Sequence, residues 1–392
     1  MKILVACIDM VPENINRQPW FYMNCITKGL REKGHDVWIL TDGINKSEDR
    51  KTIFYKDFRS FPNGVSEGIG ALVMKQGFDA VIWSTGLSDF FFRKKIDTLG
   101  VPVIAVVTSP RYSLRELLSL GKDLLFNREF VGQFFLGPIL SKQRVIDFLS
   151  IPNLKAVVFE CNETLRRYIP YGFDKKEVAV ISPPLPEDFL KILKEVKAEE
   201  NTEPKNYFKI LYFGPPLNLR GIDILVHAIS LIRKKVENVR LLILSRIEYE
   251  GLLKHEKRLN KLIKRENLGT VVQVVSGVLT QKEIIRQIIS SDLVCLPFKF
   301  AVSDVPIAIL ETVATGVPLI TTEVLGISEF RNSRRCYVVP RKDPKSLAEE
   351  IFKVIQDKGE ITRNMPAMDN LLKKHSLKNF TISYERVVKE AS

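Results

Sequence analysis

Short apolar runs alternate with longer amphipathic segments throughout the first half of the chain. Each run is almost wholly apolar, which is typical of a strand buried on both faces of a parallel sheet. The segments between the runs repeat their apolar positions at helical spacing, so helices should connect the strands. The expected strands are Lys2–Ile8, Asp36–Leu40, Asp79–Trp83, Pro102–Val107, Lys155–Phe159 and Val178–Ile181, and the expected helices are Pro19–Lys33, 65–76, 88–98 and Glu163–Ile169.

The same alternation restarts after Lys197–Asn206, a polar stretch with the composition of a linker. A chain of 392 residues exceeds what one hydrophobic core usually supports. We therefore expect an α/β protein with two doubly wound, Rossmann-like domains, residues 1–200 and 207–372, whose strands point their carboxyl ends into a shared cleft. The later strands are Lys209–Phe213, Arg240–Leu244, Val271–Val275, Leu293–Leu296, Leu319–Thr321 and Cys336–Val339, and the later helices are Ile222–Lys235, Leu252–Glu266, Gln281–Ser290, 306–315 and Pro344–Gln356.

The segment Ser303–Pro318 carries the clearest chemical signal. It predicts a loop and a helix with Pro306 in its first turn, and Gly316 can end that helix in the left-handed conformation. The helix would begin beyond the strand at Leu293–Pro297, where unpaired N–H groups and the helix dipole favour an anion. Glu311 lies one to two turns inside, where a carboxylate can accept hydrogen bonds from ribose hydroxyls.

This segment resembles the nucleotide-sugar-binding segment of GT-B glycosyltransferases, specifically the large retaining family called group 1 or family 4. The family pattern has two glutamates separated by seven residues, and Glu311 and Pro318 match its second glutamate and its later proline. Ser303 stands where the first glutamate is expected, with Asp304 next to it. Either side chain could cap the helix, and Asp304 could instead bind a sugar hydroxyl.

The resemblance covers nearly all of residues 207–360. Arg220 stands for a family lysine that holds the donor diphosphate, whereas Pro215 replaces the arginine that shares this task. Leu325–Glu329 matches a later family element in one glycine and the glutamate. Gly277 and Leu279, which follow the strand Val271–Val275, fall where the family lines its nucleobase pocket. The resemblance therefore implies a donor site made by Gly214, Arg220, Gly221, Gly277, Leu279, Ser303, Asp304, Ile307 and Glu311.

In the first half the resemblance is only topological. Family members commonly carry Gly-Gly after the first strand and a histidine after the strand Val103–Val107, but residues 9–18 lack glycine and Thr108–Arg111 takes the histidine's place. No histidine is positioned for acid–base chemistry, so the catalytic residues are unassigned. Arg246 and Lys299 are interpreted as surface charges, although either could screen a diphosphate. The cleft-edge candidates, each also explicable as structural, are Asp9, Arg17, Ser84, Thr85 and Arg111.

The net charge of +13 favours anionic partners without choosing among them. No zinc-finger spacing or RRM-like aromatic motif points to nucleic acid, so none is expected as a partner. Five scattered cysteines without C-x-x-C spacing argue against disulfides and structural zinc, and they favour the cytoplasm. The N-terminal run has the pattern of a first strand, not of a signal peptide, and the longest apolar stretch, Phe130–Leu140, is too short to span a bilayer.

Residues 111–149 mix leucine and phenylalanine with arginine and lysine, as does the run Phe90–Lys95. They could form an apolar, basic surface that contacts a membrane carrying a lipid-linked acceptor. They could equally pack inside the domain or form a subunit contact. The last helix, residues 377–392, should pack back on the first domain, as the resemblance implies.

The resemblance implies a retaining glycosyltransferase that moves a sugar from a nucleoside-diphosphate sugar to a glycan or lipid-linked acceptor. No cofactor is expected beyond this co-substrate, and no metal, because no Asp-x-Asp lies near the phosphate site. The replaced family residues leave an alternative, a non-catalytic GT-B scaffold or partner subunit. A GT-B epimerase or phosphorylase is a weaker alternative, because neither acid–base groups near the sugar nor a separate phosphate or cofactor site is evident.

Overall fold

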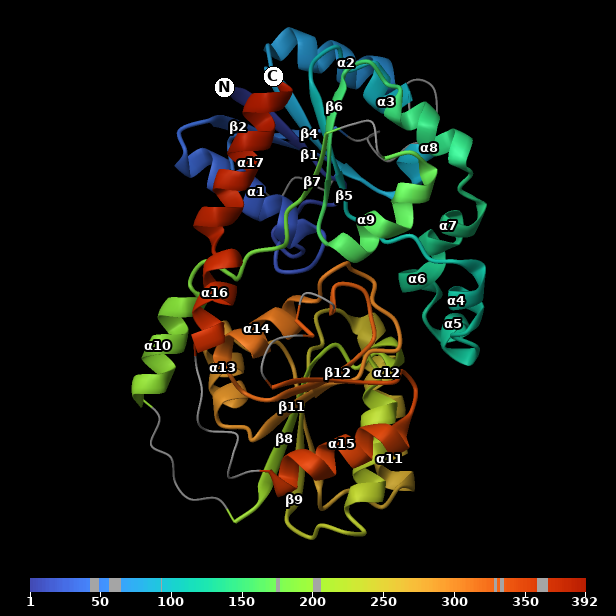
Figure 1. Ribbon diagram of the computed structural model, residues 1–392, viewed down its shortest axis with the longest axis vertical. Helices are drawn as coiled ribbons and strands as arrows, with labels where there is room; N and C mark the ends of the chain where they lie inside the picture. Colours follow the sequence, from blue (N-terminus) through green and yellow to red (C-terminus); the bar gives the residue numbers. More distant parts are fainter. Residues whose placement is uncertain are drawn as a thin grey trace.

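Two α/β lobes lie end to end in the computed structural model of the protein, and the last helix runs back along the first lobe (Figure 1). The structure describes residues 1–42, 49–55, 65–92, 94–173, 177–199, 206–327, 330–331, 335–357 and 366–392. Each lobe is built on one parallel sheet, so the prediction of two doubly wound sheets is confirmed.

The first sheet has the strand order β3-β2-β1-β4-β5-β6-β7. Its central strands are fully buried because helices cover both faces, which explains their continuous apolar sequence. The strands are β1 (Lys2–Ala6), β2 (Asp36–Thr41), β3 (Thr52–Phe54), β4 (Ala80–Thr85), β5 (Val103–Val107), β6 (Leu154–Phe159) and β7 (Glu177–Val180). The helices are α1 (Trp20–Glu32), α2 (Val65–Gln76), η2 (Leu87–Phe90), α3 (Lys94–Asp97), α4 (Leu114–Leu118), α5 (Lys122–Phe126), α6 (Arg128–Val131), η3 (Gly132–Phe135), α7 (Leu136–Ile139), α8 (Lys142–Leu149), α9 (Asn162–Tyr168) and η4 (Ile169–Tyr171).

The second sheet has the order β10-β9-β8-β11-β12-β13, so the direction in which successive strands are added reverses between β8 and β11. Ligands of open α/β sheets bind outside the strand ends at such a reversal. The strands are β8 (Phe208–Gly214), β9 (Val239–Ser245), β10 (Val272–Ser276), β11 (Leu293–Leu296), β12 (Leu319–Thr322) and β13 (Cys336–Val339). The helices that follow β7 along the chain, of which the last returns to the first lobe, are α10 (Phe189–Glu199), η5 (Asn218–Arg220), α11 (Ile222–Ile232), η6 (Glu250–Leu252), α12 (Leu253–Arg265), α13 (Gln281–Ile289), α14 (Ile307–Thr315), α15 (Pro344–Gln356), α16 (Pro366–Lys374) and α17 (Leu377–Ala391).

Two expectations from the sequence need correction. The helix expected over 88–98 is replaced by the short helices η2 and α3. The Asp89 carboxylate accepts hydrogen bonds from the Gly86 N–H and the Trp83 indole, and these bonds hold a tight turn instead. The expected linker begins later than predicted, because Lys197–Glu199 belong to α10, and residues 200–205 lie outside the described part of the chain.

Helix α17 packs against α1 of the first lobe (Figure 1). The Tyr384 hydroxyl donates to that of Tyr22 over 2.9 Å, and the Tyr22 and Phe380 rings meet edge to face with centroids 5.1 Å apart. A Cβ added at Gly29 would lie 2.1 Å from Thr381 Oγ1, so glycine permits this close crossing. The chain's end is thereby held to its beginning.

The two lobes also touch at their facing loops. The Lys299 ammonium pairs with Asp123 of the first lobe at 2.8 Å and with Asp223 of the second at 2.5 Å. The Tyr112 hydroxyl donates to the Ala301 carbonyl over 2.6 Å. Phe300 packs with the apolar core of the first lobe. The second lobe therefore presents its strand-end loops directly to the first.

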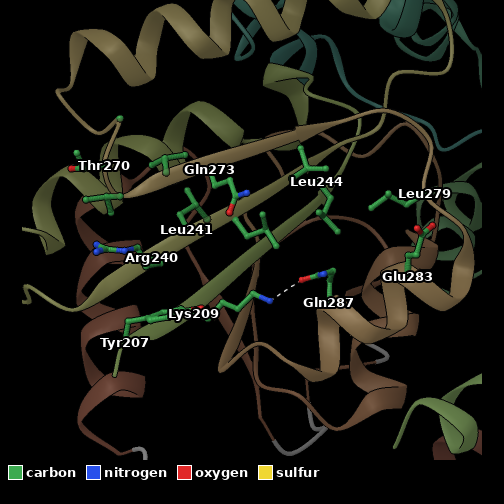
Figure 2. Close-up of a pocket in the computed structure, with 15 residues that line it drawn as sticks. Tyr207, Lys209, Arg240, Leu241, Leu244, Thr270, Gln273, Leu279, Glu283 and Gln287 are labelled. Carbon is green, nitrogen blue, oxygen red and sulfur yellow. Dashed lines mark hydrogen bonds between the residues drawn. The ribbon is translucent and has the colours of Figure 1, made fainter. Parts of the chain in front are cut away.

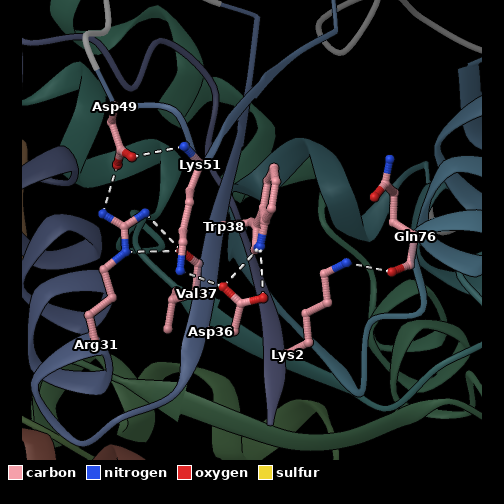
Figure 3. Close-up of polar contacts among 8 residues, drawn as sticks. All are labelled: Lys2, Arg31, Asp36, Val37, Trp38, Asp49, Lys51 and Gln76. Carbon is pink, nitrogen blue, oxygen red and sulfur yellow. Dashed lines mark hydrogen bonds and ion pairs between the residues drawn. The ribbon is translucent and has the colours of Figure 1, made fainter.

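A polar network closes the opposite end of the first sheet (Figure 3). The Arg31 guanidinium donates to the Val37 carbonyl and to Asp49 Oδ2 at 2.7 Å. Lys51 Nζ donates to Asp36 over 2.6 Å. These contacts lie at the amino ends of the strands, away from the facing loops, so they serve the fold.

Candidate functional site

Arg220 lies over the carboxyl end of β8. Its Nη2 donates to the Phe213 carbonyl over 3.3 Å, and its guanidinium lies 4.6 Å from the centroid of the Phe298 ring. Gly214 makes this position available, because a Cβ there would lie 2.7 Å from Arg220 Nη2. The predicted pair of Gly214 and Arg220 is thus brought together, with the guanidinium at the end of the strand that faces the first lobe.

Gly221 fixes the turn that carries Arg220. Its φ of +73° is a left-handed conformation that glycine adopts without strain. A Cβ at this position would lie 1.7 Å from the Pro297 carbonyl oxygen, so no other residue fits against the end of β11. The glycine therefore holds the short helix η5 close to the neighbouring strand.

Helix α14 begins at Ile307 with Pro306 as its N-cap and no side-chain capping bond. The expectation that Ser303 or Asp304 caps it is therefore wrong, since both residues lie further back in the loop. Gly316 ends the helix with φ of +83°, as the sequence predicts. In the first turn, the Ile309 N–H donates to the Pro306 carbonyl over 3.0 Å.

Glu311 projects from α14 toward two arginines. Burial raises the pKa of its carboxyl to about 7, while Arg246, a hydrogen bond from Gln281, and Arg220 act in the opposite direction. Gln281 begins α13, Arg220 ends η5 and Arg246 follows β9. Three neighbouring strand-end loops and α14 therefore supply the groups around this carboxyl.

Asp304 is fully buried at the contact between the lobes. Burial raises its pKa to about 7, partly offset by Thr164 and Arg167 of the first lobe. Burial also raises the pKa of Glu160, which follows β6, and the neighbouring Asp304 raises it further. Asp304 thus faces first-lobe groups, and a sugar could reach it only if the lobes moved apart.

Two other predicted donor residues lie along the same loop. Ile307 packs against the first-lobe core between its sheet and α17, and Ser303 is half-buried just before Asp304. The Gly326 N–H, from the later glycine-containing element, donates to the Glu163 carboxylate of the first lobe. Glu329 of that element lies outside the described residues. Ile307 is therefore a packing residue at the lobe contact in this arrangement.

Gly277 and Leu279 follow β10. Gly277 has φ of +130°, and its N–H donates to the Ser245 carbonyl over 3.0 Å, which joins this loop to the end of β9. Leu279 is half-buried and lies at one end of a cavity of about 560 Å³ (Figure 2). That cavity runs along the sheet face beside α13 to Tyr207 and Lys209, at the amino end of β8. Most of it therefore lies away from the strand ends where Arg220 and Glu311 meet.

Arg246 and Arg17 are the residues whose role the sequence did not reveal. Arg246 forms an ion pair with Glu248 at 3.4 Å, and the same carboxylate pairs with Arg17 of the first lobe at 2.9 Å. Arg246 is therefore not a simple surface charge. Lys299 is not a surface charge either, because its side chain is 5% exposed and pairs with two aspartates. The position of Arg246 directly after a strand that neighbours β8 was the available signal.

The remaining first-lobe candidates have structural contacts. The Asp9 N–H donates to Asp42 over 2.8 Å, and Ser84 lies 3.4 Å from the Thr108 hydroxyl. Thr85 donates to the Trp83 carbonyl, and the Arg111 guanidinium lies over the Tyr171 ring at 4.4 Å. These contacts give none of them a position beside Glu311.

Within the described ranges, we find no cluster of three or more His, Cys, Asp or Glu side chains that could hold a metal ion. Across the same part of the chain, every helix is too short or too polar to cross a bilayer.

Residues 207–357 match the family model described as glycosyl transferases group 1. No curated protein sequence matches the chain significantly.

Solved structures resemble the chain over its whole length. A glycosyltransferase from Rickettsia africae is 17% identical with a TM-score of 0.71, covering 100% of this chain and 98% of its own. Sucrose-phosphate synthase from Thermosynechococcus elongatus is 14% identical with a TM-score of 0.73, covering 99% and 98%. The Anabaena protein HepE, solved with UDP and glucose, is 14% identical with a TM-score of 0.66, covering 99% of both chains. At these identities the likeness establishes the fold.

Proposed function

We propose that this chain, which has the fold of the similar glycosyltransferase structures and matches the group 1 glycosyl transferase model over residues 207–357, is a retaining enzyme that transfers a sugar from a nucleoside-diphosphate sugar. The observation that carries the proposal is the position of the Glu311 carboxyl, which projects from α14 and is stabilised in its charged form by Arg220 at the strand ends of the second lobe. A guanidinium, a carboxylate and the N-terminal end of a helix match a diphosphate joined to a ribose.

Each donor part has a counterpart in the proposed site. Arg220 and the helix N–H groups bind the diphosphate, and Glu311 accepts hydrogen bonds from the ribose hydroxyls. Gly277 and Leu279 border the nucleobase, and Ser303 and Asp304 lie on the sugar side, where opening of the lobes would expose Asp304. As the bond to the sugar breaks, Arg220 stabilises the charge that grows on the leaving diphosphate.

Glu311 also explains why the site needs its arginines. Its pKa of about 7 means that the carboxylate form, the better acceptor for two hydroxyls, is only partly populated near neutral pH. Hydrogen bonds donated by the ribose hydroxyls of a bound donor would favour that form. Metal independence belongs to the proposal, because guanidinium groups can neutralise the diphosphate, and chelation by EDTA should then leave turnover unchanged.

Binding and turnover of nucleotide sugars test the proposal. UDP and UDP-glucose are the first probes, since the similar HepE structures hold them, followed by other nucleoside diphosphates. We expect wild type to bind one of them and to release the nucleoside diphosphate from its sugar. Arg220→Ala should weaken diphosphate binding about tenfold to a hundredfold. Arg265→Ala, which removes a side chain that is 69% exposed on α12, is the matched control.

Two results would contradict the proposal. Absence of nucleotide and nucleotide-sugar binding in wild type would remove the donor site altogether. Binding without any release of the nucleoside diphosphate would instead favour the non-catalytic GT-B scaffold, for which the replacement of the family arginine by Pro215 is the specific sequence observation.

We further propose that the first lobe meets its acceptor at a membrane surface. Apolar side chains project into solvent along the short helices α4 to α7, among them Leu118 (59% exposed) and Ile139 (63% exposed). Leu118→Glu with Ile139→Glu should lower binding to anionic lipid vesicles. Met74→Glu, at a 60% exposed apolar position elsewhere on the lobe, is the control, and equal binding by all variants would exclude this surface.

A further inference from the structure

Position 215, where the family carries an arginine and this chain has a proline, lies next to another arginine in space. Strands β8 and β9 pair in parallel with Gly214 opposite Ser245, so the next residues along the two strands, Pro215 and Arg246, lie side by side. The Arg246 N–H donates to the Gly214 carbonyl over 3.1 Å, which continues the strand pairing by one step. A guanidinium is thus supplied from the adjacent strand end.

Arg246 points into the proposed donor site. Burial lowers the pKa of its guanidinium, Glu248 and Glu311 raise it, and the nearby Arg220 and Arg17 lower it. The side chain is still 34% exposed, so a ligand can reach it. Arginines gathered at one point repel one another unless an anion lies among them.

Glu248 is the anion that lies there in this structure. Its carboxylate pairs with Arg246 at 3.4 Å and with Arg17, from the loop after β1, at 2.9 Å. Arg17 is 25% exposed, and its guanidinium lies 5.9 Å from the centroid of the Tyr249 ring. One carboxylate therefore joins two arginines from the two lobes, which is the geometry that a phosphate group also satisfies.

We propose that the donor diphosphate displaces Glu248 and is held by Arg246 and Arg17 together with Arg220, so that Arg246 replaces the arginine absent at Pro215 and Arg17 replaces the glycine loop of the first lobe. The inference rests on the proposed function, because it assigns the residues that bind the same donor. Glu248 keeps the arginines paired while the site is empty.

The arrangement links donor binding to lobe contact. Arg220 and Arg246 belong to the second lobe, whereas Arg17 belongs to the first. A diphosphate carries charge on both phosphates, so it offers more acceptor oxygens to three guanidinium groups than a single phosphate does. The three arginines should therefore determine the preference for diphosphates over monophosphates.

Calorimetric binding of inorganic pyrophosphate, UDP and UMP to the full chain tests this assignment. Arg246→Ala should weaken pyrophosphate and UDP binding about tenfold or more while changing UMP binding little. Arg17→Ala should act in the same direction. Glu248→Gln, which keeps the shape and removes the charge, should tighten pyrophosphate binding about threefold to tenfold.

Moving the positive charge from position 246 to position 215 tests whether Arg246 binds the diphosphate or only supports the fold. Pro215→Arg combined with Arg246→Ala restores the family position and should recover diphosphate preference that Arg246→Ala alone has lost. Arg265→Ala is the control, and thermal unfolding of each variant identifies any that fail to fold. If Arg246→Ala and Arg17→Ala bind diphosphates as wild type does, or if wild type binds neither pyrophosphate nor UDP, the inference is overturned.

The two proposals fail in different ways. Wild type that binds diphosphates through Arg246 but releases no nucleotide from a donor would contradict the proposed transfer and leave this assignment standing. If wild type turns over the donor and the Arg246→Ala variant does so with the same kinetics, this assignment is contradicted and the proposed transfer still stands.

Discussion

At the scale of single residues, Gly221 shows how backbone geometry places a charged side chain. Its positive φ and its contact with the Pro297 carbonyl both exclude a Cβ. The sequence identified this glycine by its place in the family element, and the structure supplies the reason. Arg220 depends on it, because Gly221 is the position at which the turn passes directly against the end of β11.

Gly221→Ala should lower the free energy of unfolding by about 2–4 kcal/mol, because it combines a strained φ with a backbone clash. It should also weaken diphosphate binding by moving Arg220. Gly269→Ala is the control, since a Cβ there meets nothing within 4 Å, and its effect should stay within about 0.5 kcal/mol. Chemical denaturation of both variants measures the difference, and equal midpoints would refute this account of the turn.

At the scale of secondary-structure elements, the close crossing of α1 and α17 holds the C-terminus on the first lobe. Gly29 and Thr381 lie where the helices cross too closely for a Cβ on the first. Within the described part of the chain, the buried Thr381 hydroxyl has no hydrogen-bond partner. Steric fit, and not hydrogen bonding by this pair, therefore decides how near the helices lie.

Gly29→Ala should destabilise the protein by about 1–3 kcal/mol through overpacking. Adding Thr381→Ala to the same chain should recover most of that loss, because it removes the atoms that the new methyl group meets. A double-mutant cycle from thermal or denaturant unfolding measures the coupling. Purely additive effects would show that the helices can separate without cost.

At the scale of the whole molecule, the lobes meet through buried carboxyl groups as well as through ion pairs. Asp304 of the second lobe and Glu160 of the first are both fully buried and both have a raised pKa, caused first by burial. Each group favours its protonated form in the folded chain more than in the unfolded chain. Lobe contact therefore responds to pH through this pair.

The free energy of unfolding should fall as pH rises from about 4, the range of an unfolded carboxyl, through about 7, the pKa of Asp304 in the folded chain. Asp304→Asn should remove part of this dependence and stabilise the protein at pH 8 by about 1–3 kcal/mol, with little gain at pH 4.

Asp188→Asn, at an exposed position before α10, is the matched control and should leave the pH profile as in wild type. Denaturant unfolding between pH 4 and pH 8 provides the measurement. A wild-type profile that rises with pH across this range would contradict the assignment of the buried pair.

The sequence by itself determined what depends on local patterns: the alternation of buried strands and amphipathic helices, and the glycine that ends α14. These follow from near-neighbour sterics and from burial on both faces of a sheet, so they are visible in the order of residues. Only the tertiary structure decided which distant groups meet. The pairing of β8 with β9 sets Arg246 beside Pro215, and contact between the lobes brings Arg17 to Glu248 and Asp304 to Glu160. Such encounters depend on how whole sheets and lobes pack, which no local spacing records.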